Sequence, residues 1–139
     1  MLVRDGRNDA MAVPMMFITT MAIEEGKLEA FKEAVAKSLA FLEENGPQVM
    51  AAVYIDEEQM IANGVQLHRD SESILLHWLL ADPYMRDVMQ YTTTKGVEIY
   101  GEPSEAVMAG MERLSSMGAT VVVRSRLAGF SRLPEAPSA

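Results

Sequence analysis

The side chains best suited to chemistry gather in one stretch of the chain, residues 60–91. It contains both histidines, His68 and His77, the only tryptophan, Trp78, and two of the four tyrosines, Tyr84 and Tyr91. Histidine exchanges a proton near neutral pH, and tryptophan and tyrosine donate hydrogen bonds to a ligand oxygen. This stretch is therefore the candidate site, and proton transfer supported by hydrogen bonds is the chemistry it offers.

The first part of this stretch, residues 60–68, is expected to form a strand. Two sets of residues alternate there, and a period of two places them on opposite faces of a sheet. One set is apolar except for Asn63, and the other contains Gln66 and ends in His68. Helices on one face and a lined cavity on the other would give this pattern; a strand with one face in water is the alternative. Which face points inwards stays open, because a shift of one residue exchanges the sets.

A helix is expected to follow, capped by Asp70 or Ser71, whose side-chain oxygens can accept from the first turn. It is largely apolar, so we expect it to be buried on more than one side, with His77 in apolar company. Residues 82–83, Asp-Pro, are expected to break it and to start a second piece that carries Tyr84. If the break only bends the axis, His77 and Tyr84 point the same way, because seven residues make two helical turns.

Other elements must hold this stretch in place. Strands are expected at 15–23, 48–56, 95–101 and 119–126, and helices at 27–44 and from 104. The resulting order, β-α-β-β-α-β followed by one more helix and strand, begins with the elements of a ferredoxin-like α+β fold, an antiparallel sheet with both helices on one face. The other face needs cover, which a second copy of the chain would supply in a homodimer. The segment 103–133 is expected to enlarge the sheet or the dimer contact.

Length and composition limit the classes of protein. At 139 residues we expect one domain, 15–133, between flexible tails at 1–14 and 134–139. A formal charge of −8 argues against nucleic acid or an anionic membrane as partner, and no apolar run has transmembrane length. The absence of cysteine excludes disulfides and fits a cytoplasmic protein. Two histidines nine residues apart have no usual metal-ligand spacing, so no metal site is expected.

A family pattern runs through residues 64–91, GVQLHRDSESILLHWLLADPYMRDVMQY. It consists of a strand with a polar-aromatic end, an acidic-serine helix start, a helix histidine, and a small residue followed by Asp, Pro and an aromatic. With the β-α-β order before it, the chain resembles the antibiotic biosynthesis monooxygenase-like members of the dimeric α/β-barrel superfamily over residues 15 to about 100. His77 and residues 82–84 match best, whereas residues 66–68, Gln-Leu-His, replace the usual acidic-x-Trp strand ending.

The resemblance implies a dimeric barrel and an oxidoreductase that oxidises a planar aromatic phenol or quinol with O2, without metal, flavin or other cofactor. Such chemistry needs a base, a donor that stabilises an oxyanion, and a cavity that excludes water. The residues expected as base or proton relay are His77 and His68, and those expected to orient the ligand are Asn63, Gln66, Trp78 and Tyr84. The alternative is a non-catalytic dimeric module of the same fold, which binds a small metabolite or only a partner surface.

Overall fold

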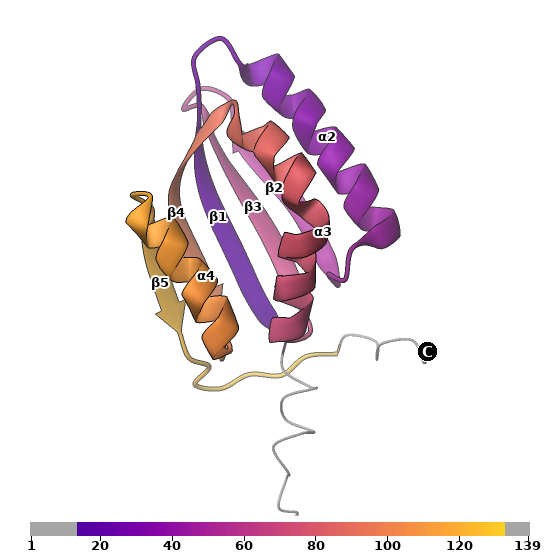
Figure 1. Ribbon diagram of the computed structural model, residues 1–139, viewed down its shortest axis with the longest axis vertical. Coiled ribbons are helices and arrows are strands. Elements are labelled where there is room, and N and C mark those ends of the chain that lie inside the picture. The colour runs from indigo at the N-terminus through magenta and orange to yellow at the C-terminus, as the bar shows by residue number, and fades with distance from the viewer. Residues whose placement is uncertain (1–13, 133–139) are drawn as a thin grey trace, which may run out of the picture.

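The structure is a computed structural model that describes residues 14–132, a sheet with helices on one of its faces (Figure 1). The elements are β1 (Met15–Ile23), α2 (Leu28–Asn45), β2 (Met50–Asp56), β3 (Ile61–His68), α3 (Ser71–Met89), β4 (Thr92–Tyr100), α4 (Glu105–Ser116) and β5 (Thr120–Arg124). This confirms the α+β class and the predicted order of elements. The expected tails, apart from Pro14, fall outside the described residues.

The five strands form one sheet in the order β2-β3-β1-β4-β5. The first four are antiparallel neighbours, as in a ferredoxin-like fold. The last strand, β5, pairs in parallel with β4. A parallel neighbour requires a crossover connection, and α4 provides it. The C-terminal addition therefore enlarges the sheet, which is one of the two outcomes expected from the sequence.

Helix α3 runs through the position where a break was predicted. Asp70 is its cap and accepts a hydrogen bond of 2.9 Å from the backbone N–H of Ser73. The predicted break at residues 82–83 is wrong, because the helix continues to Met89 with Pro83 inside it. Proline removes one backbone hydrogen bond of the helix, but the residues before and after it are held by packing against the core. Ala81 before the proline is fully buried, and Val88 after it packs against a core cluster.

Two groups of buried apolar side chains fill the space between the sheet and the helices. The first comprises Met15, Phe17, Ile74, Val97, Ile99, Val107 and Met111. The second comprises Met21, Ile23, Phe31 and Ala62. The first group joins β1 and β4 to α3 and α4, and the second joins β1 and β3 to α2, so all three helices are fixed on the same face.

The opposite face of the sheet carries no helix within residues 14–132 (Figure 1). Half-buried apolar side chains, among them Ile18, Val65 and Leu67, lie on it, together with Asn63, whose amide donates a 3.0 Å bond to the Thr20 hydroxyl. Among the described helices, none is both long and apolar enough to cross a membrane. The uncovered face is thus largely apolar at β1 and β3, with Glu98 of β4 beside Ile18.

Candidate functional site

The strand register decides which β3 side chains face the helices. Gln66 pairs with Phe17 of β1, and His68 pairs with Met15. Directly paired residues share a face, and both β1 partners are buried under the helices. Gln66 and His68 therefore point to the helix-covered face. The sequence left open which set of β3 residues faces the helices, and the register answers this, because the set containing Asn63 occupies the uncovered face.

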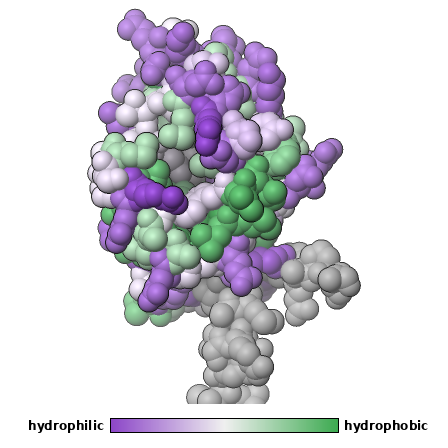
Figure 2. Space-filling model, viewed as in Figure 1, coloured by the Kyte–Doolittle hydropathy of each residue, from purple (hydrophilic) through white to green (hydrophobic). Residues whose placement is uncertain are grey.

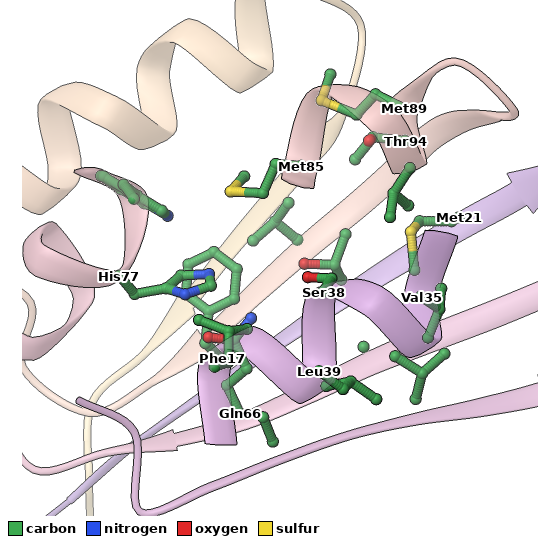
Figure 3. Close-up of a pocket in the computed structure, with 18 of the residues that line it drawn as sticks. Phe17, Met21, Val35, Ser38, Leu39, Gln66, His77, Met85, Met89 and Thr94 are labelled. Carbon is green, nitrogen blue, oxygen red and sulfur yellow. The ribbon is translucent and has the colours of Figure 1, made fainter. Parts of the chain in front are cut away.

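A cavity of about 150 Å³ lies between the sheet and the helices (Figure 3). Its walls are mostly Val, Leu, Met and aromatic side chains. The polar side chains among its lining residues are Thr19, Ser38, Gln66, His77, Trp78 and Thr94. A dry cavity of roughly 150 Å³ has room for a single aromatic ring such as benzene. The space therefore suits a small, mainly apolar ligand with one polar end.

His77 supplies the polar end of the cavity, and a row of hydrogen bonds holds its ring from behind. Its Nδ1 lies 2.8 Å from the amide nitrogen of Gln48, which lies 3.2 Å from the amide oxygen of Gln66. That oxygen lies 2.8 Å from Nε2 of His68, and Nδ1 of His68 lies 2.7 Å from the Ser73 hydroxyl. We call these five residues the polar chain, and it runs from the cavity to the first turn of α3.

Burial keeps both histidines neutral. It lowers the pKa of His77 to about 4 and that of His68, whose ring lies near the His77 ring, to about 3. A neutral imidazole carries one N–H. Because the Gln48 amide donates to Nδ1 of His77, the His77 proton sits on Nε2. Because the Gln66 oxygen accepts from Nε2 of His68, Nδ1 of His68 accepts from Ser73. Both rings are therefore Nε2–H tautomers.

The structure brings together only part of the predicted site. His77, Gln66 and Trp78 line the cavity, and His68 lies one hydrogen bond behind Gln66. Tyr84 does not line it. Its ring stacks on Phe41 of α2, with centroids 4.6 Å apart and planes at 24°.

Asn63, Gln48 and Ser73 complete the comparison with the sequence prediction. Asn63 lies on the uncovered face, away from the cavity. Sequence reasoning missed Gln48 and Ser73, which belong to a loop and a helix start and carry no local pattern. The described residues contain no group of three or more His, Asp or Glu side chains placed to hold a metal ion.

Trp78 reaches the cavity because α4 has a glycine opposite its ring. A Cβ atom at Gly110 would overlap the indole and lie 2.7 Å from its Cη2 atom. Alanine in a helix is favoured over glycine by about 1 kcal/mol, but overpacking costs about 1–3 kcal/mol. We expect Gly110→Ala to lower the melting temperature, whereas Gly64→Ala, whose Cβ would meet only Met21 at 3.9 Å, should not. An unchanged melting temperature for Gly110→Ala would contradict this close packing.

His68 and His77 are expected to make the protein less stable in acid. Their unfolded-state pKa is 6.5 and their folded-state values are about 3 and 4. Below pH 6.5 the unfolded chain therefore binds more protons, and each histidine lowers the free energy of unfolding by about 1.4 kcal/mol per pH unit until its folded pKa is reached. Urea unfolding as a function of pH checks this. In His77→Gln the free energy of unfolding should fall less steeply with pH below pH 6.5. The same slope as in the wild type would contradict the prediction.

Comparisons with known proteins concern the fold. No protein-family model matches the sequence, and no curated protein matches it. The crystal structure of MupZ from Pseudomonas fluorescens matches with a TM-score of 0.69 at 18% identity, over 86% of this chain and 94% of that chain. SnoaB, a cofactor-independent oxygenase from Streptomyces nogalater, matches with a TM-score of 0.56 at 11% identity, over 67% of this chain and 96% of that chain.

A third solved structure carries the family name itself. It is called "Putative antibiotic biosynthesis monooxygenase from Nitrosomonas europaea" and matches with a TM-score of 0.58 at 14% identity, over 66% of this chain and 91% of that chain. The match to MupZ covers a larger share of this chain than the other two matches do. The chain therefore has the ferredoxin-like fold of the antibiotic biosynthesis monooxygenase-like proteins.

Proposed function

We propose that this protein is a cofactor-independent monooxygenase that oxidises a small planar phenol or quinol with O2 inside the cavity. The observation that carries the proposal is a neutral histidine, His77, in the lining of a cavity whose walls are mainly apolar. A neutral imidazole can take up a phenol proton, and apolar walls limit the access of water to reactive intermediates. The fold shared with SnoaB, which is named a cofactor-independent oxygenase, supports the same reaction class.

The proposed reaction begins with His77 as the tautomer that carries its proton on Nδ1, so that the phenol can give its proton to the free lone pair of Nε2. The phenolate transfers one electron to O2, and the phenoxyl radical and superoxide then combine by a C–O bond on the ring. His77 returns the proton to the peroxide, and loss of water leaves a quinone. One phenol and one O2 give one quinone and one water, so the balance needs no further oxidant or reductant.

Oxygen uptake tests this function directly. The protein, stripped with chelator, is offered phenols and quinols of one or two rings with increasing acidity, while O2 and quinone absorbance are followed. We expect one O2 consumed per quinone formed, and faster turnover of the more acidic phenols. Binding of these phenols without any uptake above the protein-free rate would overturn the proposal.

One observation favours the alternative of a non-catalytic binding module. A histidine with a pKa of about 4 is a weak base towards a phenol, whose pKa is near 10 as in tyrosine. The difference of about 6 units corresponds to roughly 8 kcal/mol for proton transfer without compensation. The module would bind a small aromatic at His77 without turning it over. Thermal stabilisation by phenols without O2 uptake would support this reading.

We also propose that the uncovered face of the sheet is the contact of a homodimer. Met16, Ile18, Val65, Leu67 and Tyr54 give that face a half-exposed or exposed apolar surface. A sheet with helices on one face exposes the other unless a second layer covers it. A second copy is the simplest cover, because a two-fold dimer buries the same face twice.

Lysine substitutions separate this surface from the other apolar patch. Figure 2 shows a green patch on the helix-covered face, where Leu76 and Leu79 of α3 are exposed. We expect Val65→Lys to turn a dimer into a monomer in sedimentation velocity, because Val65 lies between Ile18 and Ala52 and a lysine there places an unpaired charge in the contact. Leu79→Lys is the matched control and should leave the dimer intact. A wild-type monomer, or dissociation by Leu79→Lys alone, would contradict the proposed contact.

A further inference from the structure

The polar chain has a symmetry that bears on what His77 can do. Gln48 makes both of its contacts in the chain through its amide nitrogen, and its buried oxygen has no partner among the described residues. Gln66 makes both of its contacts through its amide oxygen. An amide whose chain contacts all use one end can turn over about its last bond and meet the same neighbours with the opposite end.

Turning both amides over gives a second arrangement with the same links, in which the Gln48 amide nitrogen takes the buried place that its oxygen now occupies. The Gln66 nitrogen would then donate to Nε2 of His68 and to the Gln48 oxygen, which would also accept from Nδ1 of His77. His68 would carry its proton on Nδ1 and donate it to the Ser73 hydroxyl. Every link of the chain is kept, with each donor and acceptor exchanged. At the cavity, Nε2 of His77 would present a lone pair in place of an N–H.

We propose that Gln48, Gln66, His68 and Ser73 are positioning residues that reverse together and thereby set whether His77 donates or accepts a hydrogen bond in the cavity. This inference deepens the proposed function and rests on it for its chemical meaning. As a donor, Nε2–H binds a carbonyl or phenolate oxygen. As an acceptor, Nε2 takes the proton of a phenol. The ligand class that uses both states is a phenol that becomes a quinone.

The chain sets a tautomer and does not carry protons from one histidine to the other. Carboxamides between His68 and His77 accept at oxygen and donate at nitrogen, but neither gains nor loses a proton near neutral pH. His68 is also outside the lining of the cavity. The role of base or proton relay expected for His68 is therefore replaced by an indirect one, in which its own tautomer follows that of His77.

Two substitutions to glutamate give opposite predictions. A carboxylate only accepts hydrogen bonds. In Gln48→Glu, the new carboxylate must accept from Nδ1 of His77 and from Gln66, so the Gln66 amide has to turn over. His68 should then switch to the Nδ1–H tautomer, although residue 48 does not touch it. In Gln66→Glu the carboxylate matches the present arrangement, so His68 should keep the Nε2–H tautomer. Both variants add one negative charge at neighbouring residues of the polar chain. Each is therefore the control for the effect of charge in the other.

Nitrogen-15 NMR of histidine-labelled protein in mildly alkaline buffer distinguishes the two neutral tautomers and the cation. We expect the Nε2–H form at both histidines in the wild type and in Gln66→Glu, and the Nδ1–H form at His68 in Gln48→Glu. A His68 ring that keeps Nε2–H in Gln48→Glu, with the fold intact by circular dichroism, would overturn the coupling. This readout needs no ligand, so it is independent of whether the protein oxidises phenols.

Small ligands test the same coupling in the wild type, also if Gln48→Glu fails to fold. The probes are p-cresol, which donates and accepts, and 4-methylanisole, which only accepts. We expect p-cresol to raise the Nδ1–H population of both histidines together, and 4-methylanisole to leave both as Nε2–H. A change at His77 without one at His68 would overturn the proposal. Loss of O2 uptake in Gln66→Glu with 4-methylanisole binding retained would then connect the coupling to the reaction.

Discussion

Replacing His77 with phenylalanine is expected to lower the rate of O2 uptake with phenols by about 10²–10⁴-fold, the usual contribution of a positioned general base. The side chain is 5% exposed and forms the polar end of the cavity, with Nδ1 held by Gln48 at 2.8 Å. Phenylalanine keeps a flat ring of similar size but has no nitrogen. The substitution leaves one N–H of the Gln48 amide without its partner at a cost of about 1–3 kcal/mol, so circular dichroism must show that the variant is folded.

Tyr84→Phe is the matched control for that measurement. Both substitutions leave a phenyl ring on α3, but the Tyr84 ring stacks on Phe41 outside the cavity. Removing the Tyr84 hydroxyl should therefore leave the rate of O2 uptake unchanged. Equal uptake in the wild type and in His77→Phe would mean that the phenols oxidise without the protein's help. A loss in Tyr84→Phe as large as that in His77→Phe would place the reaction elsewhere than in this cavity.

The elements of the fold could be predicted because their signals are local. Residues 15–23 form the predicted strand, and the helix expected at 27–44 was found one residue further on. The prediction failed at Pro83, since proline usually ends a helix and the packing that overrides it comes from distant residues. The alternation in β3 was recognised, but the face that the helices cover depends on pairing with β1.

The candidate site could be predicted only where a residue type is rare enough to be noticed. His77 and Trp78 were found for that reason. Gln48 lies 29 residues before His77 in the chain, and only the fold brings its amide against the ring. Ser73 looked like an ordinary first-turn residue, yet its hydroxyl holds His68. Contacts between neighbouring elements leave no periodic trace in one sequence, so the polar chain could not be predicted.

Removing the ring of Phe17 is expected to have the largest effect on stability. Phe17 is 5% exposed, belongs to the core between β1 and α3, and meets Trp78 edge to face with ring centroids 6.2 Å apart. Replacing a buried phenylalanine with alanine costs about 3–5 kcal/mol, because apolar contacts are lost and a void remains. Urea unfolding of Phe17→Ala, with Phe41→Ala as a control outside the cavity, measures this loss. The control should lose less, since Phe41 is only half-buried.

The position of Phe17 in the cavity wall makes part of this loss recoverable. The void left by the substitution would be continuous with the cavity, so a ligand one ring larger than p-cresol, such as 2-naphthol, should bind the variant better than the wild type. A ligand that binds only the folded state adds about 2.7 kcal/mol at a concentration 100 times its dissociation constant. Phe41→Ala should show no such gain. If 2-naphthol stabilised both variants equally, the ring would not bind at Phe17, and the cavity would not be the ligand site.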